Sequence, residues 1–244
     1  MSHASARFAA HRREAIWADL ASKGYALTDD GTIGLPERFR ATFHQTYFND
    51  FTIRHDEGDR PVDRKRARDV IRYWWRGEGL ELQEHDTITI TDRAGIDGKR
   101  DHRRVELLQD PDAAEMVRTF LSLVPVRLRQ SDGTFGVNLF RTFTKVVSKP
   151  HRDDEQFVIL YVLDRIGDGA ESYLYKSKDV SEKGETVANP VFWRQLNPGQ
   201  ILIFDDARFW HGATPLLAQP GKTARRDVVV CTVDYRESYL AASA

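Results

Sequence analysis

The sequence is poor in cysteine, has no excess of charge of either sign, and contains no long apolar run. Its one cysteine, Cys231, lies in the apolar segment 228–231, which excludes an internal disulfide framework and is typical of a buried thiol in a reducing compartment. The 36 basic and 37 acidic side chains leave a formal net charge of −1, which provides no global field to attract nucleic acid or an anionic membrane. The composition favours a cytoplasmic protein with a small-molecule partner.

The absence of long apolar stretches also bears on export and membrane insertion. No run approaches the roughly 18 apolar residues of a membrane-spanning helix. The first twenty residues carry several arginines and lack the apolar segment of a signal peptide. We therefore expect no export and no membrane partner. With 244 residues, 41% of them hydrophobic, the sequence predicts a single domain over 1–244, allows a homo-oligomer, and does not determine the oligomeric state.

Apolar spacing predicts that residues 1–125 are largely helical. Four helices are expected, and their apolar positions are Phe8, Ile16, Trp17 and Leu20; Phe39 and Phe43 after Pro36; Ala67, Val70, Ile71 and Trp74; and Met116, Val117, Phe120 and Leu123 after Asp110-Pro111. The third has the clearest helical period, which would leave the basic cluster 64–68 on a solvated face.

From residue 126 to 236 the pattern changes to short runs of β-branched and aromatic residues separated by Gly, Asp and Pro. Strands are expected near 137–147, 156–164, 171–177, 191–194, 200–205 and 226–235, with weaker candidates at 87–91 and 126–130. This spacing predicts an α+β, mainly β protein, in which a jelly roll (double-stranded β-helix) carries N-terminal helices on one face. The charged loop 178–189 is a candidate lid.

Three residues form a candidate metal site. His151 and Asp153 precede an expected strand, and in extended backbone their side chains project from one face. Taken alone, this pair is more simply a solvated turn, and a lone His211 is more simply a packed core histidine. Together, two imidazoles and one carboxylate on a β-scaffold match the facial triad of non-haem iron enzymes.

Arg226 begins the last expected strand and is a candidate anion-binding residue. A guanidinium pointing into the barrel would need a carboxylate, and the distal carboxylate of 2-oxoglutarate is such a partner. Two alternatives stay open on the sequence. Arg226 could pair with Asp205 or Asp206, and the adjacent Arg225 could take its place.

The chain resembles the bacterial 2-oxoglutarate- and iron(II)-dependent dioxygenases of the isoleucine 4-hydroxylase type, which hydroxylate free amino acids. The resemblance covers residues 135–235 and rests on the order and spacing of several motifs: His151-Arg152-Asp153, Gly169-Ala170-Glu171-Ser172, Pro198-Gly199-Gln200, Asp205-Asp206-Ala207-Arg208, His211-Gly212-Ala213-Thr214-Pro215 and Arg226-Asp227-Val228. Where relatives tend to carry a Gly-Gly pair before the Glu, this chain has Gly167-Asp168-Gly169-Ala170. The first 120 residues match only in general character.

The resemblance implies a cofactor set and residue roles. Iron(II) would be held by His151, Asp153 and His211, which would also be the catalytic centre, with 2-oxoglutarate as cosubstrate anchored by Arg226 and O2 as oxidant. Because Asp153 leaves no coordination position for chloride, hydroxylation is favoured over halogenation. A free amino acid would also need a cation for its carboxylate and an acceptor for its ammonium group. Arg141 is a candidate for this carboxylate or for 2-oxoglutarate, and Asp154 or Glu155 for the amine.

Three other interpretations are weighed against this one. The same chemistry could act on a carrier-tethered or modified amino acid. A cupin-like barrel that binds a metal or ligand without oxygenase activity would share the β-scaffold, but the His-x-His pair of cupins is absent. Two basic clusters, 64–68 and 99–104, could bind nucleic acid, although adjacent acidic residues favour an ordinary solvated surface.

Overall fold

The computed structural model describes residues 3–55, 64–85, 104–143, 148–153, 155–181 and 185–233. Its main feature is an antiparallel sheet of seven strands in the order β1-β10-β6-β13-β4-β2-β3. The strands are β1 (Tyr25–Asp29), β10 (Gln200–Asp205), β6 (Phe157–Ile166), β13 (Arg225–Val233), β4 (Asp132–Thr142), β2 (Arg64–Arg76) and β3 (Gly79–Glu84).

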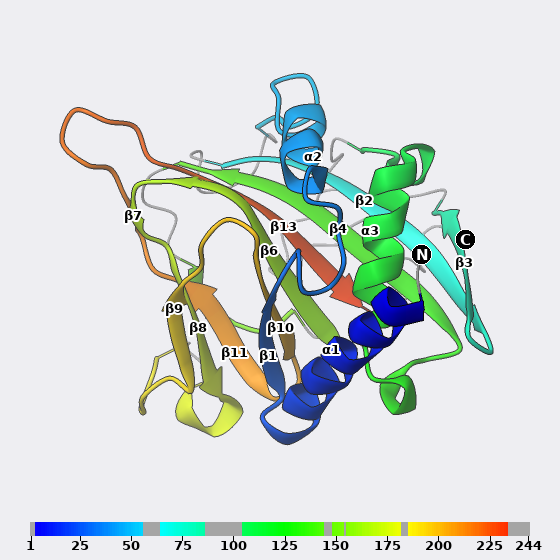
Figure 1. Ribbon diagram of the computed structural model, residues 1–244. Helices are drawn as coiled ribbons and strands as arrows, with labels where there is room; N and C mark the ends of the chain where they lie inside the picture. Colours follow the sequence, from blue (N-terminus) through cyan, green and yellow to red (C-terminus); the bar gives the residue numbers. More distant parts are fainter. Residues whose placement is uncertain are drawn as a thin grey trace, which may run out of the picture.

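A smaller antiparallel sheet packs against one face of the large one (Figure 1). It contains β5 (Ser148–His151), β11 (Phe209–Ala213), β8 (Glu171–Lys176) and β9 (Phe192–Gln195), while β7 (Asp168–Gly169) pairs with β12 (Leu216–Leu217). Buried side chains from both sheets, including Leu174, Phe204 and Val228, fill the space between them. We call this space the barrel interior. The predicted mainly β jelly-roll fold is confirmed.

Three helices cover the opposite face of the large sheet: α1 (His3–Ser22), α2 (Phe39–Tyr47) and α3 (Pro111–Ser122) (Figure 1). They contribute Ile16, Phe39 and Phe120 to a core that includes Leu139 and Val229 from the sheet. Alternation along each strand therefore sends one set of side chains into the barrel interior and the other set toward the helices. The predicted packing of N-terminal helices on one face is confirmed.

The fourth predicted helix is α3, and the two residues that predicted its start, Asp110 and Pro111, act as expected. The side chain of Asp110 accepts hydrogen bonds from the backbone N–H of Asp112 (2.9 Å) and Ala113 (3.4 Å), and Pro111 occupies the first turn, where no N–H is required. Met116 and Phe120 are fully buried against the sheet. The helices expected around Ile16 and Phe39 are also present.

The helix predicted around Ala67–Trp74 is wrong, because these residues belong to β2. The side chains that β2 turns toward the helices are Ala67, Asp69, Ile71 and Tyr73, so a buried carboxylate interrupts the apolar alternation. Asp69 is held there by the backbone N–H of Leu107 at 2.8 Å and by Arg104 at 3.5 Å. Because Asp69 is polar, strict alternation is hidden in the sequence. The apolar residues that are left, Ala67, Val70, Ile71 and Trp74, have the spacing of a helix face.

The weak strand candidate at 126–130 is also wrong, and other expectations fall outside the described residues. Segment 126–130 contains a 3-10 turn, η2 (Val126–Leu128), closed by the N–H of Leu128 on the carbonyl of Pro125 at 2.8 Å. Two more such turns are η1 (Leu107–Gln109) and η3 (Ser177–Asp179). The candidate strand 87–91, residues 144–147 and 234–235, the side chain of Phe8 and all of Asp154 lie outside the described part.

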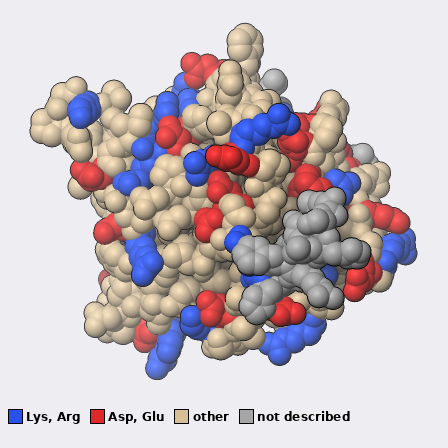
Figure 2. Space-filling view, viewed as in Figure 1, with Lys and Arg blue, Asp and Glu red and all other residues tan. Residues whose placement is uncertain are grey.

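The surface carries both signs of charge. Basic and acidic side chains are intermixed over the face shown in Figure 2. Within the described ranges, no helix has the length and apolar character needed to cross a membrane.

Candidate active site

Strand pairing in the small sheet brings His151 and His211 together. They are directly opposed residues of β5 and β11, with ring centroids 4.3 Å apart. Asp153 follows β5 and places its carboxylate oxygens 3.8 Å from Nε2 of His151 and 3.5 Å from Nε2 of His211. One ligand atom from each residue lies within 4.8 Å of the other two. This separation allows all three side chains to bind one metal ion.

An oxygen atom next to Nδ1 orients each imidazole, on the side of the ring away from Asp153. Nδ1 of His151 donates to the carbonyl of Lys149 at 2.8 Å, and Nδ1 of His211 lies 3.3 Å from Oδ1 of Asp206. The side chain of Asp206 is completely buried, and its other oxygen accepts from the backbone N–H of Glu155 at 3.2 Å. Because Nδ1 of His151 is hydrogen-bonded and Nδ1 of His211 lies beside a carboxylate, the two Nε2 atoms face the carboxylate of Asp153, as metal-binding imidazoles require. The sequence pattern did not indicate this role of Asp206.

The cluster has the electrostatics of a cation site. Burial would lower the pKa of His211, but the carboxylates of Asp153 and Asp206 raise it to about 9. Burial would likewise raise the pKa of Asp153, but His211, His151 and Arg68 lower it to about 2. Partial desolvation and the charge of His211 lower the pKa of His151. The cluster therefore retains a proton on His211 at neutral pH, and a metal ion would displace it.

The three side chains of the cluster differ in their exposure to solvent. The side chain of His151 is 45% exposed, that of Asp153 35% and that of His211 only 13%. His211 packs inward against Phe204, with ring centroids 4.9 Å apart. The three residues therefore lie at the mouth of the barrel interior, with His151 toward solvent.

Arg226 points into the same interior. It is 6% exposed, its guanidinium donates to Oγ of Ser172 at 3.1 Å, and its Nε has no hydrogen-bond partner among the described residues. Burial and the nearby Arg165 lower its pKa to about 10, so it remains a cation at neutral pH. Leu174 lies opposite His211, and Ser172 is two residues further along the same face of β8. A short dicarboxylate could therefore reach from the histidines to Arg226.

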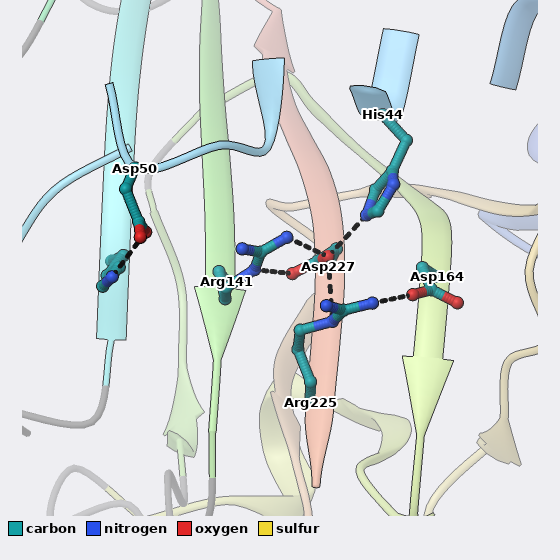
Figure 3. A network of polar contacts seen from close by, with 7 residues as sticks. His44, Asp50, Arg141, Asp164, Arg225 and Asp227 are labelled. Carbon is teal, nitrogen blue, oxygen red and sulfur yellow. Dashed lines mark hydrogen bonds and ion pairs between the residues drawn. The ribbon is translucent and has the colours of Figure 1, made fainter. Parts of the chain in front are cut away.

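Arg141 and Arg225 lie elsewhere. Arg141 donates to Asp227 and Arg225 forms an ion pair with it, and Asp227 faces the helices rather than the barrel interior (Figure 3). Arg141 binds both oxygens of Asp227 at 2.8 Å, and Arg225 also bonds Asp164. The structure therefore does not bring Arg141 to the His151 cluster, and Asp205 and Asp206 are not the partners of Arg226. Glu155 is buried beside Asp206.

A second group of potential metal ligands lies in this network. His44, Asp164 and Asp227 have ligand atoms within 4.8 Å of one another. However, the oxygens of Asp227 already accept from Arg141 and from His44, at 2.6 Å, and two guanidinium groups supply the positive charge. A divalent cation would meet those charges at close range, so this group is an ion-pair network and not a metal site.

Comparisons with known proteins place the chain in a family. The family model "2OG-Fe dioxygenase" matches residues 43–232. A solved bsmA homolog from Methylobium petroleophilum PM1 is 17% identical with a TM-score of 0.71, covering 91% of this chain and 92% of that one. IDO from Bacillus thuringiensis is 18% identical with a TM-score of 0.70, covering 92% and 96%.

A third solved structure agrees with these two. The Fe(II)/(alpha)ketoglutarate-dependent dioxygenase TqaL is 11% identical with a TM-score of 0.71, covering 96% of this chain and 90% of that one. No curated protein matches the chain. At these identities the structures show the shared fold, while the family model covers most of the sequence. The chain belongs to the 2OG-Fe dioxygenase family and is an iron(II)- and 2-oxoglutarate-dependent dioxygenase.

Proposed function

We propose that His151, Asp153 and His211 hold the iron(II) ion and that Arg226, with Ser172, binds the distal carboxylate of 2-oxoglutarate. The observation that carries this assignment is the position of the buried Arg226 guanidinium. It bonds Ser172, which lies two residues along β8 from Leu174, the residue opposed to His211. Its charge requires an anion, and no carboxylate among the described residues supplies one in an ion pair. The donor set of two imidazoles and a carboxylate suits iron(II).

The reaction that we propose is hydroxylation of an unactivated C–H bond in a free amino acid or a close derivative. Substrate, 2-oxoglutarate and O2 would give the hydroxylated product, succinate and CO2. Iron and 2-oxoglutarate supply the oxidising chemistry when bound, and the protein positions the target carbon and shelters the site. The main alternative is the same reaction on a carrier-tethered or modified amino acid.

The test is to incubate the protein with iron(II), 2-oxoglutarate and a panel of free amino acids. Succinate and an amino acid heavier by one oxygen, detected by mass spectrometry, are the expected products. If succinate forms but no free amino acid gains oxygen, the tethered or modified substrate is favoured. If iron does not bind the protein, the ligand assignment is rejected.

A further inference from the structure

The basic cluster at residues 64–68 has a different meaning in the strand than in the expected helix. Along β2, alternate side chains point to opposite faces, so Arg64, Arg66 and Arg68 share one face and Lys65 points to the other. Arg66 is opposed to Phe140 of β4. Directly opposed residues of an antiparallel pair project from the same face, and Phe140 packs into the core between the two sheets. The three arginines therefore face the barrel interior.

One of these arginines, Arg68, lies close to the proposed iron site, and the other two continue the row along β2. Arg66 is only 4% exposed, and the guanidinium of Arg64 lies 4.9 Å from the ring centroid of Phe140. Arg68 is within electrostatic reach of Asp153. The three arginines thus form a row of cations on the wall of the large sheet, in which Arg66 is buried and Arg64 and Arg68 are partly exposed.

Two buried polar atoms on the same wall have no hydrogen-bond partner within the described part of the chain. Asn138, opposed to Arg68, is 8% exposed, and its side-chain oxygen has no hydrogen-bond partner among the described residues. The same holds for the hydroxyl of Thr232, which is 4% exposed. Thr232 is two residues from Val230, the residue of β13 opposed to Asn138, so it belongs to the same face. Buried polar atoms are almost always satisfied, and these point to a polar ligand in the interior.

We propose that Arg66, Arg68 and Asn138 form the binding subsite of the primary substrate, and that this substrate is a small molecule with a free carboxylate and an N–H donor. The carboxylate binds the guanidinium groups, whose fork matches its two oxygens. The N–H group donates to the side-chain oxygen of Asn138, which can only accept. This inference rests on the proposed function and narrows its substrate class.

The subsite is separate from that of 2-oxoglutarate. Arg226 is opposed to Thr142 of β4, whereas Arg66 and Arg68 are opposed to Phe140 and Asn138 further along the same strand. Two carboxylates can therefore bind at once without competing for one cation. A carrier-tethered amino acid has its carboxylate blocked as a thioester and would bring no carboxylate to these arginines. The subsite accordingly favours a free acid over a tethered one.

Ligand binding tests the inference without turnover. The protein is loaded with Ni(II), which does not activate oxygen, and with saturating 2-oxoglutarate. The twenty common amino acids, their carboxamides and their N-acetyl derivatives are then titrated by calorimetry. We expect at least one free acid to bind, and its carboxamide to bind at least tenfold more weakly. Equal binding of acid and carboxamide, or binding by none of the acids, overturns the inference.

Variants locate the binding site. Arg66→Gln and Arg68→Gln are expected to weaken binding of that acid about tenfold or more, and to leave its carboxamide unaffected. Lys65→Gln is the matched control, because it removes the same charge from the opposite face of β2, where Lys65 pairs with Asp50 at 2.7 Å. If Lys65→Gln weakens binding as much as the arginine variants, the inference is overturned.

The same titrations separate this inference from the proposed function. If Ni(II) and 2-oxoglutarate themselves do not bind, the iron and cosubstrate assignment fails. If both bind and the acid binds equally to wild-type protein and to Arg66→Gln and Arg68→Gln, only the subsite fails. A folded variant is confirmed by its unchanged affinity for 2-oxoglutarate, and the comparison of acid with carboxamide on the wild type needs no variant.

Discussion

Arg226 and Asp227 are neighbours on β13, yet their side chains lie on opposite faces of the large sheet. Asp227 has partners of opposite charge there, whereas Arg226 has none among the described residues. On the helix face, Asp227 is completely buried, accepts from Arg141 and His44, and forms an ion pair with Arg225 (Figure 3). On the interior face, Arg226 bonds Ser172, and its Nε has no partner among the described residues.

The difference separates charges that stabilise the fold from charges that recruit a ligand. Burial would raise the pKa of Asp227, but the hydrogen bonds from Arg141 and His44 lower it. Side chains of the protein therefore offset the desolvation of this carboxylate. For Arg226 burial lowers the pKa to about 10, and no described carboxylate offsets it. A saturated network on one face and an incomplete one on the other mark which side of the sheet binds small molecules.

The largest expected effect is at the metal cluster on the interior side. Asp153→Ala removes the only carboxylate among the three proposed ligands and should abolish substrate-dependent succinate formation, by about 1,000-fold or more, because no metal would remain in place. The fold should persist, since the side chain of Asp153 is 35% exposed. Succinate is measured by mass spectrometry, with circular dichroism as the control for folding. Near-normal turnover would reject Asp153 as a ligand.

The next largest effect contrasts two arginines on opposite faces. Arg226→Met should raise the KM for 2-oxoglutarate by about 30- to 100-fold, the value of a charge-assisted hydrogen-bond pair in a buried site. Arg141→Met is the matched control and should leave this KM within about twofold, because Arg141 bonds Asp227 on the other face. Steady-state succinate formation measures both. An equal rise in the two variants would remove the distinction between the faces.

On the helix face, the expected loss is in stability. Asp227→Asn should lower the free energy of unfolding by about 3 kcal/mol, because it leaves the two guanidinium groups without their buried carboxylate. Urea denaturation measures the change. The KM for 2-oxoglutarate of the folded variant should stay within about threefold of wild type. Unchanged stability would show that the network does not hold β13 in place.

The smallest effect is a pH dependence that distinguishes metal-free from metal-bound protein. Because the pKa of His211 is raised to about 9, its stabilising ion pair with Asp153 and Asp206 is fully present below pH 6.5 and is lost as the pH rises through 9. Metal must displace that proton, so the Kd for Ni(II) should fall by about tenfold per pH unit between pH 7 and 9. Calorimetry at several pH values checks this. A flat profile would contradict a protonated His211.

Several elements were predictable because their signals are local. The cap at Asp110 with Pro111 predicted α3, and runs of β-branched residues predicted most strands of the second half. The helix expected around Ala67–Trp74 failed because Asp69 occupies a buried position on the face that β2 turns toward the helices. Its burial depends on Arg104 and on the backbone of Leu107, which are distant in the sequence.

The sequence by itself determined which residue types were available for the metal site. The spacing of short β-branched and aromatic runs predicted a jelly roll, and the order of His151-x-Asp153, His211 and a following arginine predicted an iron site. Only the tertiary structure decided which arginine faces the barrel interior. The physical reason is that strand pairing between distant segments sets the face of every side chain. That pairing turned Arg66, Arg68 and Arg226 inward and engaged Arg141 and Arg225 on the other face.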